Sequence, residues 1–164
     1  MKNLTITPSE NMDSITVNWL GPYSFDQLTP KELMRKMGVY VVLHGPSYLF
    51  IGQTKRGKAI FREAKVNREE EYWEGLKKLG VVSGEKPAWY RLKNDVYKNC
   101  ELYAGVVSKN EFNLLDDLHK LLVFKIQPVC NDKFVKHLKT NTQFHTIHLG
   151  SIPEGIENKI TSIG

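Results

Sequence analysis

The sequence predicts an α/β (α+β) protein, in which helices pack on a mixed β-sheet. Two observations lead to this prediction. Short runs of β-branched and aromatic residues recur along the chain. A segment at residues 110–126 carries leucines at helical spacing instead. The predicted order is strand, helix, strand, strand, helix, strand, helix, and the 164 residues are about the length of one domain.

The first elements are a strand, a turn and a helix. "SITVNW" at residues 14–19 alternates between polar and apolar side chains, as a strand does, and "GPYSF" at 21–25 is a predicted turn. "TPKELMRKM" opens with Thr29 as an N-cap and Pro30 at the first helical position. Three apolar side chains then share one face of this predicted helix: Leu33, Met34 and Met37.

A hairpin and a helix come next. "GVYVVL" at 38–43 and "YLFIG" at 48–52 are rich in β-forming residues and are separated by the turn signal "HGPS". A helix is expected somewhere between Lys58 and Leu79, ended by "SGEKPAW". The two strands therefore predict an antiparallel pair that feeds a helix.

The second half of the chain predicts a strand, a buried helix and a tail. "CELYAGVV" at 100–107 is the strand, and the helix at 110–126 ends before Pro128. The tail from Asp132 is expected to be loop, in which "FHTIHL" can form a short strand. Four histidines are interpreted as ordinary surface or packing residues: His44, His137, His145 and His148.

Composition narrows the class of protein. The net charge of +5 favours an anionic partner only weakly, but several cations cluster within eleven residues: Lys55, Arg56, Lys58, Arg62 and Lys65. The N-terminus has no apolar segment of a signal peptide, and no apolar run is long enough to span a membrane. With its two cysteines interpreted as buried thiols, the chain is expected to be cytoplasmic and without a membrane partner.

The stretch from Gly52 to Lys58 approaches a phosphate-binding P-loop. A P-loop needs a Ser or Thr after the lysine to bind magnesium, and this chain has Ala59 there. A hairpin also precedes Gly52, where a P-loop would follow a parallel strand. The sequence therefore argues against a nucleotide-binding P-loop.

The same hairpin resembles the GIY-YIG nuclease superfamily. "GVY" at 38–40 corresponds to GIY, and "FIG" at 50–52 corresponds to YIG with phenylalanine in place of tyrosine. Arg62 lies ten residues beyond Gly52 on the next predicted helix, and Pro128-x-x-Asn131 matches the family's closing motif. Segments near both ends, "WLGPYSF" and "IHLGSIPEGIENKI", look like the flanks of a bacterial and phage subgroup.

The resemblance implies one domain over residues 1–164. Its core, at about 36–132, would be a small mixed or antiparallel three-stranded sheet flanked by helices. It also implies metal-dependent hydrolysis of DNA, with Mg or Mn as the cofactor if the chain is active. Tyr40 would help to activate water, Arg62 would steady charge on the phosphate, and Asn131 would support the site. Lys55, Arg56, Lys58 and Lys65 would contact nucleic acid.

The chain departs from the family at positions that carry chemistry. His119 stands where the family has its metal-binding glutamate, and Phe50 lacks the hydroxyl of the second tyrosine. His119 is the candidate metal ligand and Asp117 the alternative, although an imidazole suits zinc, nickel or copper better than magnesium. Without a partner ligand, His119 is more simply explained as a hydrogen-bonded helix histidine.

Three functions remain open from the sequence. The favoured hypothesis is a nuclease-fold protein that binds DNA with impaired or absent catalysis. The alternatives are an active, divalent-metal-dependent DNA endonuclease and a protein-interaction module or inhibitor that reuses the fold.

Overall fold

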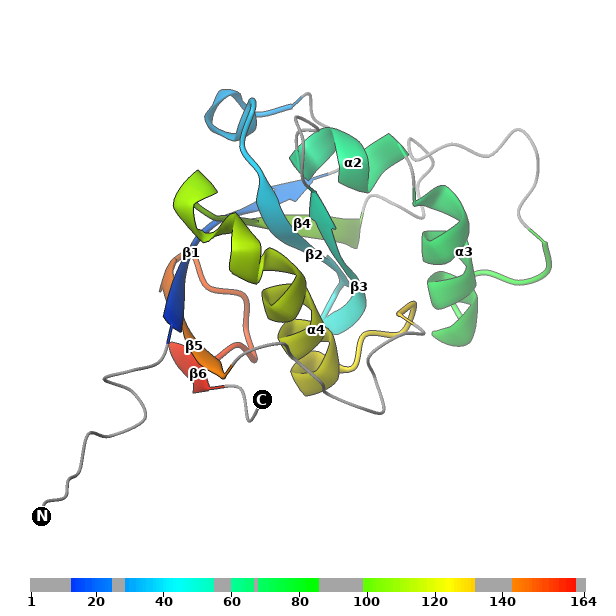
Figure 1. Cartoon of the computed structure of the whole chain (residues 1–164). Coiled ribbons are helices and arrows are strands. Elements are labelled where there is room, and N and C mark those ends of the chain that lie inside the picture. The colour runs from blue at the N-terminus through cyan, green and yellow to red at the C-terminus, as the bar shows by residue number, and fades with distance from the viewer. Residues whose placement is uncertain are drawn as a thin grey trace, which may run out of the picture.

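Six strands form one mixed sheet in the order β3-β2-β4-β1-β5-β6 (Figure 1). The computed structural model describes residues 13–24, 29–54, 60–66, 68–85, 99–131 and 143–161, with the backbone alone at 65, 66 and 161. The strands are β1 (Asp13–Ser24), β2 (Gly38–His44), β3 (Ser47–Thr54), β4 (Cys100–Val106), β5 (Phe144–Gly150) and β6 (Lys159–Thr161). The helices are η1 (Lys31–Leu33), α2 (Ile60–Val66), α3 (Glu69–Lys78), η3 (Lys109–Leu114) and α4 (Leu115–Ile126). The predicted α/β class is confirmed, and the sheet has six strands, more than the three-stranded core that the resemblance implied.

Strand β2 is the centre of the antiparallel part of the sheet. It pairs with β3 on one side and with β4 on the other, both antiparallel, so the predicted hairpin is confirmed. Its first six residues are all buried, because helices cover both faces of the sheet. Alternate side chains therefore enter two different hydrophobic cores.

The two cores lie on opposite faces of the sheet. Tyr40 and Val42 pack with residues of α2 and α3 in one core. Val39 and Val41 pack with the leucines of α4 in the other. Figure 1 shows α2 and α3 apart from α4, which lies across the sheet near β2 and β3.

Several predicted boundaries are wrong, each for a local reason. The predicted turn at 21–25 is wrong up to Ser24, because β1 continues to that residue past a register shift between Leu20 and Tyr23. Such an irregularity accommodates Pro22, which has no N–H for the ladder. The predicted helix at 29–37 is only the short η1, and Arg35 has a left-handed φ of 63° that no helix tolerates.

The remaining elements extend the predictions. The single helix expected between Lys58 and Leu79 is two helices, α2 and α3. The helix predicted at 110–126 begins as the 3-10 turn η3 and then continues as α4. "FHTIHL" does form a strand, β5, which lies parallel to β1 and carries the unpredicted β6 on its outer edge.

Two further predictions concern cysteines and membranes. Cys100 and Cys130 are both free thiols, the first buried and the second partly exposed. None of the helices described combines the length and apolarity needed to cross a lipid bilayer.

Candidate functional site

Tyr40 lies opposite Gly52 in the β2–β3 pair. Its side chain is fully buried and its ring packs over Gly52, where a Cβ would overlap the phenol. A glycine is needed at this point because it lets the aromatic ring approach the neighbouring backbone. The two strand motifs noted in the sequence therefore meet through one contact.

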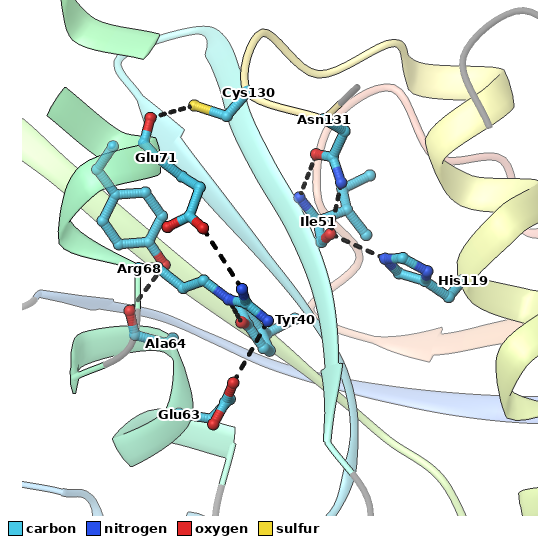
Figure 2. Close-up of polar contacts among 10 residues, drawn as sticks. Tyr40, Ile51, Glu63, Ala64, Arg68, Glu71, His119, Cys130 and Asn131 are labelled. Atoms are coloured by element: carbon cyan, nitrogen blue, oxygen red, sulfur yellow. Dashed lines mark hydrogen bonds and ion pairs between the residues drawn. The ribbon is translucent and has the colours of Figure 1, made fainter. Parts of the chain in front are cut away.

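Arg68 is the arginine that reaches Tyr40. Its Nε donates to the Tyr40 hydroxyl at 3.3 Å, and its terminal nitrogens lie 3.4 Å from Glu63 and 3.5 Å from Glu71 (Figure 2). Glu63 comes from α2 and Glu71 from α3, with Arg68 at the N-cap of α3. One cation is thus shared between two carboxylates and a phenol.

The Arg68 guanidinium also lies over Phe50, with its central carbon 5.1 Å from the ring centroid. This is a cation–π contact. The Phe50 ring therefore supports Arg68, and it has no hydroxyl to offer. Phe50 in turn meets Tyr72 edge-on, and the Tyr72 hydroxyl donates to the Ala64 carbonyl at 2.7 Å.

The electrostatics of this cluster keep Tyr40 neutral and Arg68 charged. Burial raises the pKa of Tyr40 to about 12, although the hydrogen bond and charge of Arg68 act in the opposite direction. Burial lowers the pKa of Arg68, but its contacts with Tyr40, Glu71 and Glu63 outweigh this and raise it. At neutral pH, Tyr40 therefore stays a neutral phenol beside a permanent cation.

Arg62 occupies a different place from Arg68. It lies on the exposed side of α2, and the described contacts of Tyr40 involve Arg68 instead. Motif spacing singled out Arg62 because it was counted from Gly52 along the chain, and such a count does not show which arginine faces Tyr40. A usable signal for Arg68 was its position just before three glutamates, where an i,i+3 pair with Glu71 can form.

Asn131 and His119 meet on the other side of β3, at its open edge (Figure 2). Asn131 accepts from the Ile51 N–H through Oδ1 and donates to the Ile51 carbonyl through Nδ2, both at 2.9 Å. His119 Nε2 lies 3.0 Å from the same carbonyl. Because a carbonyl oxygen only accepts, Nε2 carries the proton and donates.

These contacts close the edge of the sheet. The backbone N–H groups of Val129 and Cys130 also donate to β3, at Tyr48 and Leu49. Unpaired edge strands invite unwanted pairing with other chains, and this segment covers the edge. Asn131 and His119 therefore hold backbone in this structure, and neither contacts Tyr40 among the hydrogen bonds described.

The predicted metal role of His119 narrows to one ring nitrogen. Because Nε2 carries a proton and donates it to the Ile51 carbonyl, only Nδ1 could ligate a metal in this arrangement, and the role stays a prediction. The alternative ligand Asp117 is buried 4.0 Å from Lys120 and lies two positions away, so it projects from a different side of α4. Over the described ranges, no three His, Cys, Asp or Glu side chains gather as metal ligands would.

The predicted nucleic-acid contacts fall largely outside the described residues. Lys55, Arg56 and Lys58 belong to the segment 55–59, which lies outside them. Lys65 is in α2, with only its backbone described. Their roles stay predictions.

Comparisons with known protein families, with curated proteins and with solved structures find no match to this chain.

Proposed function

We propose that this chain is a nucleic-acid-binding domain on a GIY-YIG-like sheet, with impaired or absent phosphodiester cleavage. The order β3-β2-β4, all antiparallel, agrees with the layout that the sequence motifs imply. The Tyr40–Gly52 contact joins the two motifs in space. These features support the relationship, and the chemistry of the site then argues for weak catalysis.

The proposal of weak catalysis rests on the contacts of the Arg68 guanidinium. A guanidinium stabilises a phosphoryl transition state when its donors are aimed at the developing charge. The Arg68 donors are instead directed at Glu63, Glu71 and Tyr40. A phosphate would have to displace two carboxylates, and it would be repelled by both.

The other motif residues are engaged in the same way. Tyr40 is fully buried, so a water or phosphate reaches its hydroxyl only if Arg68 moves. Asn131 uses both ends of its amide on Ile51, and His119 shares that carbonyl. Residue types associated with catalysis therefore serve here to hold the fold together.

Binding to nucleic acid rests on charge outside this cluster. The chain carries 23 basic and 18 acidic residues, and Arg62 is one of the exposed cations beside the basic segment that follows β3. Phosphate contacts made by such side chains release counterions, so binding weakens as salt rises. The proposed domain would bind nucleic acid through contacts with the phosphate backbone of the nucleic acid.

A second candidate, an active DNA endonuclease using Mg or Mn, is favoured by one observation. Tyr40, Arg68 and two carboxylates lie together, and these residue types suit phosphoryl chemistry. A rearrangement that separates Arg68 from Glu63 would be needed to make them available. This candidate requires cleavage that depends on Arg68.

Fluorescence anisotropy with a labelled, mixed-sequence DNA duplex tests the proposed function. We expect saturable binding whose affinity falls steeply as salt is raised. The double variant K77A/K125A removes exposed lysines on α3 and α4, and its affinity shows how far binding depends on net charge alone. Absence of binding at low salt would refute the proposal and would favour a protein-interaction module.

A further inference from the structure

A groove of about 450 Å³ lies at the end of the sheet where β2 begins and β4 ends. Residues from β1, from the segment after η1 and from η3 line it. Its backbone frame is fixed, because Val107 N–H donates to the Met37 carbonyl at 3.1 Å and Ile60 N–H donates to the Lys36 carbonyl at 3.4 Å. These two bonds tie the segment that carries Lys36 and Met37 to the end of β4 and to the start of α2.

Among the charged residues that line this groove, cations outnumber carboxylates by three to one. Arg35, Lys36 and Lys109 contribute to it, and all three residues are exposed. Arg35 adopts a left-handed backbone with a φ of 63°, which turns the chain sharply between η1 and β2. Two segments far apart in the sequence thus bring positive charge to one depression.

One carboxylate shares the groove. Glu111 accepts from the Thr16 N–H, with its oxygens 3.2 and 3.4 Å from that nitrogen. Thr16 pairs with β5 on one side of β1 and lies just before the residues that pair with β4 on the other, so Glu111 accepts the N–H where β4 gives no partner. Its position is explained by this bond, and the lining keeps a net charge of +2 from three cations and one carboxylate.

The groove lies at the end of the sheet where β3 also ends. Gly38 follows Met37 directly and pairs with Thr54, the last residue of β3. The next residue along the chain is Lys55, which opens the basic stretch. The cations of the groove therefore lie at the same end of the sheet from which this stretch departs.

We propose that this groove binds the phosphate backbone of nucleic acid, through Arg35, Lys36 and Lys109. The inference rests on the proposed function, and it assigns the contact to a surface separate from the Tyr40–Arg68 cluster. An open depression lined by cations from two segments of the chain suits a charged polymer, which offers several phosphates at once.

A matched pair of triple variants tests the assignment. The groove variant is R35N/K36A/K109A, in which asparagine tolerates the left-handed backbone at position 35. The control variant is K77A/K125A/K159A, which removes the same charge from exposed positions elsewhere. Thermal melting of both variants checks that each is folded. Affinity for a fluorescein-labelled, mixed-sequence DNA duplex is then measured at several salt concentrations.

The salt dependence separates the groove from net charge. Each phosphate contact that is lost lowers the slope of log affinity against log salt by about 1, so the groove variant should lose about 3. The control should keep most of the wild-type slope. Equal losses of salt slope in the two variants would overturn the assignment of the groove as a DNA-binding surface and leave the proposed function standing. Absence of wild-type binding would overturn both.

Two further measurements define the ligand. Inorganic pyrophosphate is used as a competitor, and we expect it to displace DNA only at high excess, since a polymer engages several cations together. If wild-type protein binds pyrophosphate tightly, the groove variant loses that binding and wild type does not bind DNA, the polymer assignment would be overturned.

E111Q keeps an acceptor for the Thr16 N–H and removes the one negative charge of the lining, so DNA binding should tighten about threefold. An unchanged affinity would contradict the contact.

Discussion

The Tyr40 ring fills the space beside Gly52, its partner across the β2–β3 pair. The contact places the phenol hydroxyl at the surface of the core formed with α2 and α3, within reach of Arg68. Because Gly52 has no side chain, the ring of Tyr40 can lie against it, and this determines where Tyr40 points. It also ties the glycine of the second motif to packing, whatever the chemistry of the site.

Replacing Gly52 by alanine should destabilise the protein. The added Cβ would overlap the Tyr40 ring, and overpacking of this kind costs about 1–3 kcal/mol in the free energy of unfolding. Urea denaturation measures the change. In a Y40V background the same substitution should cost much less, because the ring is gone. An equal cost in both backgrounds would show that the contact with Tyr40 is not the cause.

Removing the two carboxylates around Arg68 should strengthen binding to DNA. In E63Q/E71Q the guanidinium loses both ion-pair partners and becomes available to a phosphate. The salt slope of DNA binding should then rise by about 1, as for one added phosphate contact.

Two controls isolate Arg68 in that experiment. E74Q/E157Q makes the same charge change at exposed positions and should alter affinity less. Adding R68A to E63Q/E71Q should abolish the gain. A gain that persists without Arg68 would mean that bulk charge, and no specific guanidinium, is responsible.

The Asn131 side chain should protect the backbone N–H of Ile51 from hydrogen exchange. N131L removes the two hydrogen bonds to Ile51 and leaves its N–H without that acceptor at the edge of β3. We expect a loss of about 1–3 kcal/mol in stability and faster hydrogen exchange at Ile51. N110L, at an exposed position on η3, serves as the control and should change stability little. Unchanged exchange at Ile51 would contradict the structural role.

His148 should make the fold sensitive to acid. Trp19 Nε1–H donates to His148 Nδ1 at 2.8 Å, so the ring proton is on Nε2, which lies 2.7 Å from the Thr146 hydroxyl and donates to it. Burial lowers the pKa of His148 from 6.5 to about 4. Between these values the unfolded state takes up a proton that the folded state refuses, so stability falls as pH drops from 6.5 toward 4.

The acid loss can be measured and assigned. The two pKa values differ by about 2.5 units, each worth about 1.4 kcal/mol, so the total loss should be on the order of 3 kcal/mol. H148Q keeps an acceptor for Trp19 and a donor for Thr146 but does not titrate, so its stability should vary less across this range. His119, whose pKa burial also lowers, contributes in the same direction in both proteins. Parallel pH profiles would contradict the assignment.

Local signals in the sequence identified the strands that carry the motifs. The β2–β3 hairpin followed from β-forming residues around "HGPS", and α4 followed from its leucine spacing. Features that depend on distant contacts could not be predicted in this way. The parallel pairing of β5 with β1 joins Asp13 to Phe144, and the three-residue β6 is too short to show a pattern.

In the candidate site, too, local motifs were visible in the sequence and contacts between distant segments were not. The motif singled out Tyr40 as a water-activating residue, and that role stays a prediction, while the structure places Tyr40 opposite Gly52. Arg68 was missed, because which arginine reaches Tyr40 depends on how the chain turns between α2 and α3. The use of Asn131 on Ile51 depends on the course of the chain beyond α4, which sequence spacing does not give.

Cleavage of supercoiled plasmid tests the central claim most directly. Wild-type protein, R68A and R62A would be incubated with DNA and either Mg²⁺ or Mn²⁺, at protein concentrations that saturate binding. If the site binds without efficient catalysis, all three proteins should leave the plasmid supercoiled while wild type remains bound to it. Nicking by wild type that R68A or R62A abolishes would contradict this account and would identify an active nuclease.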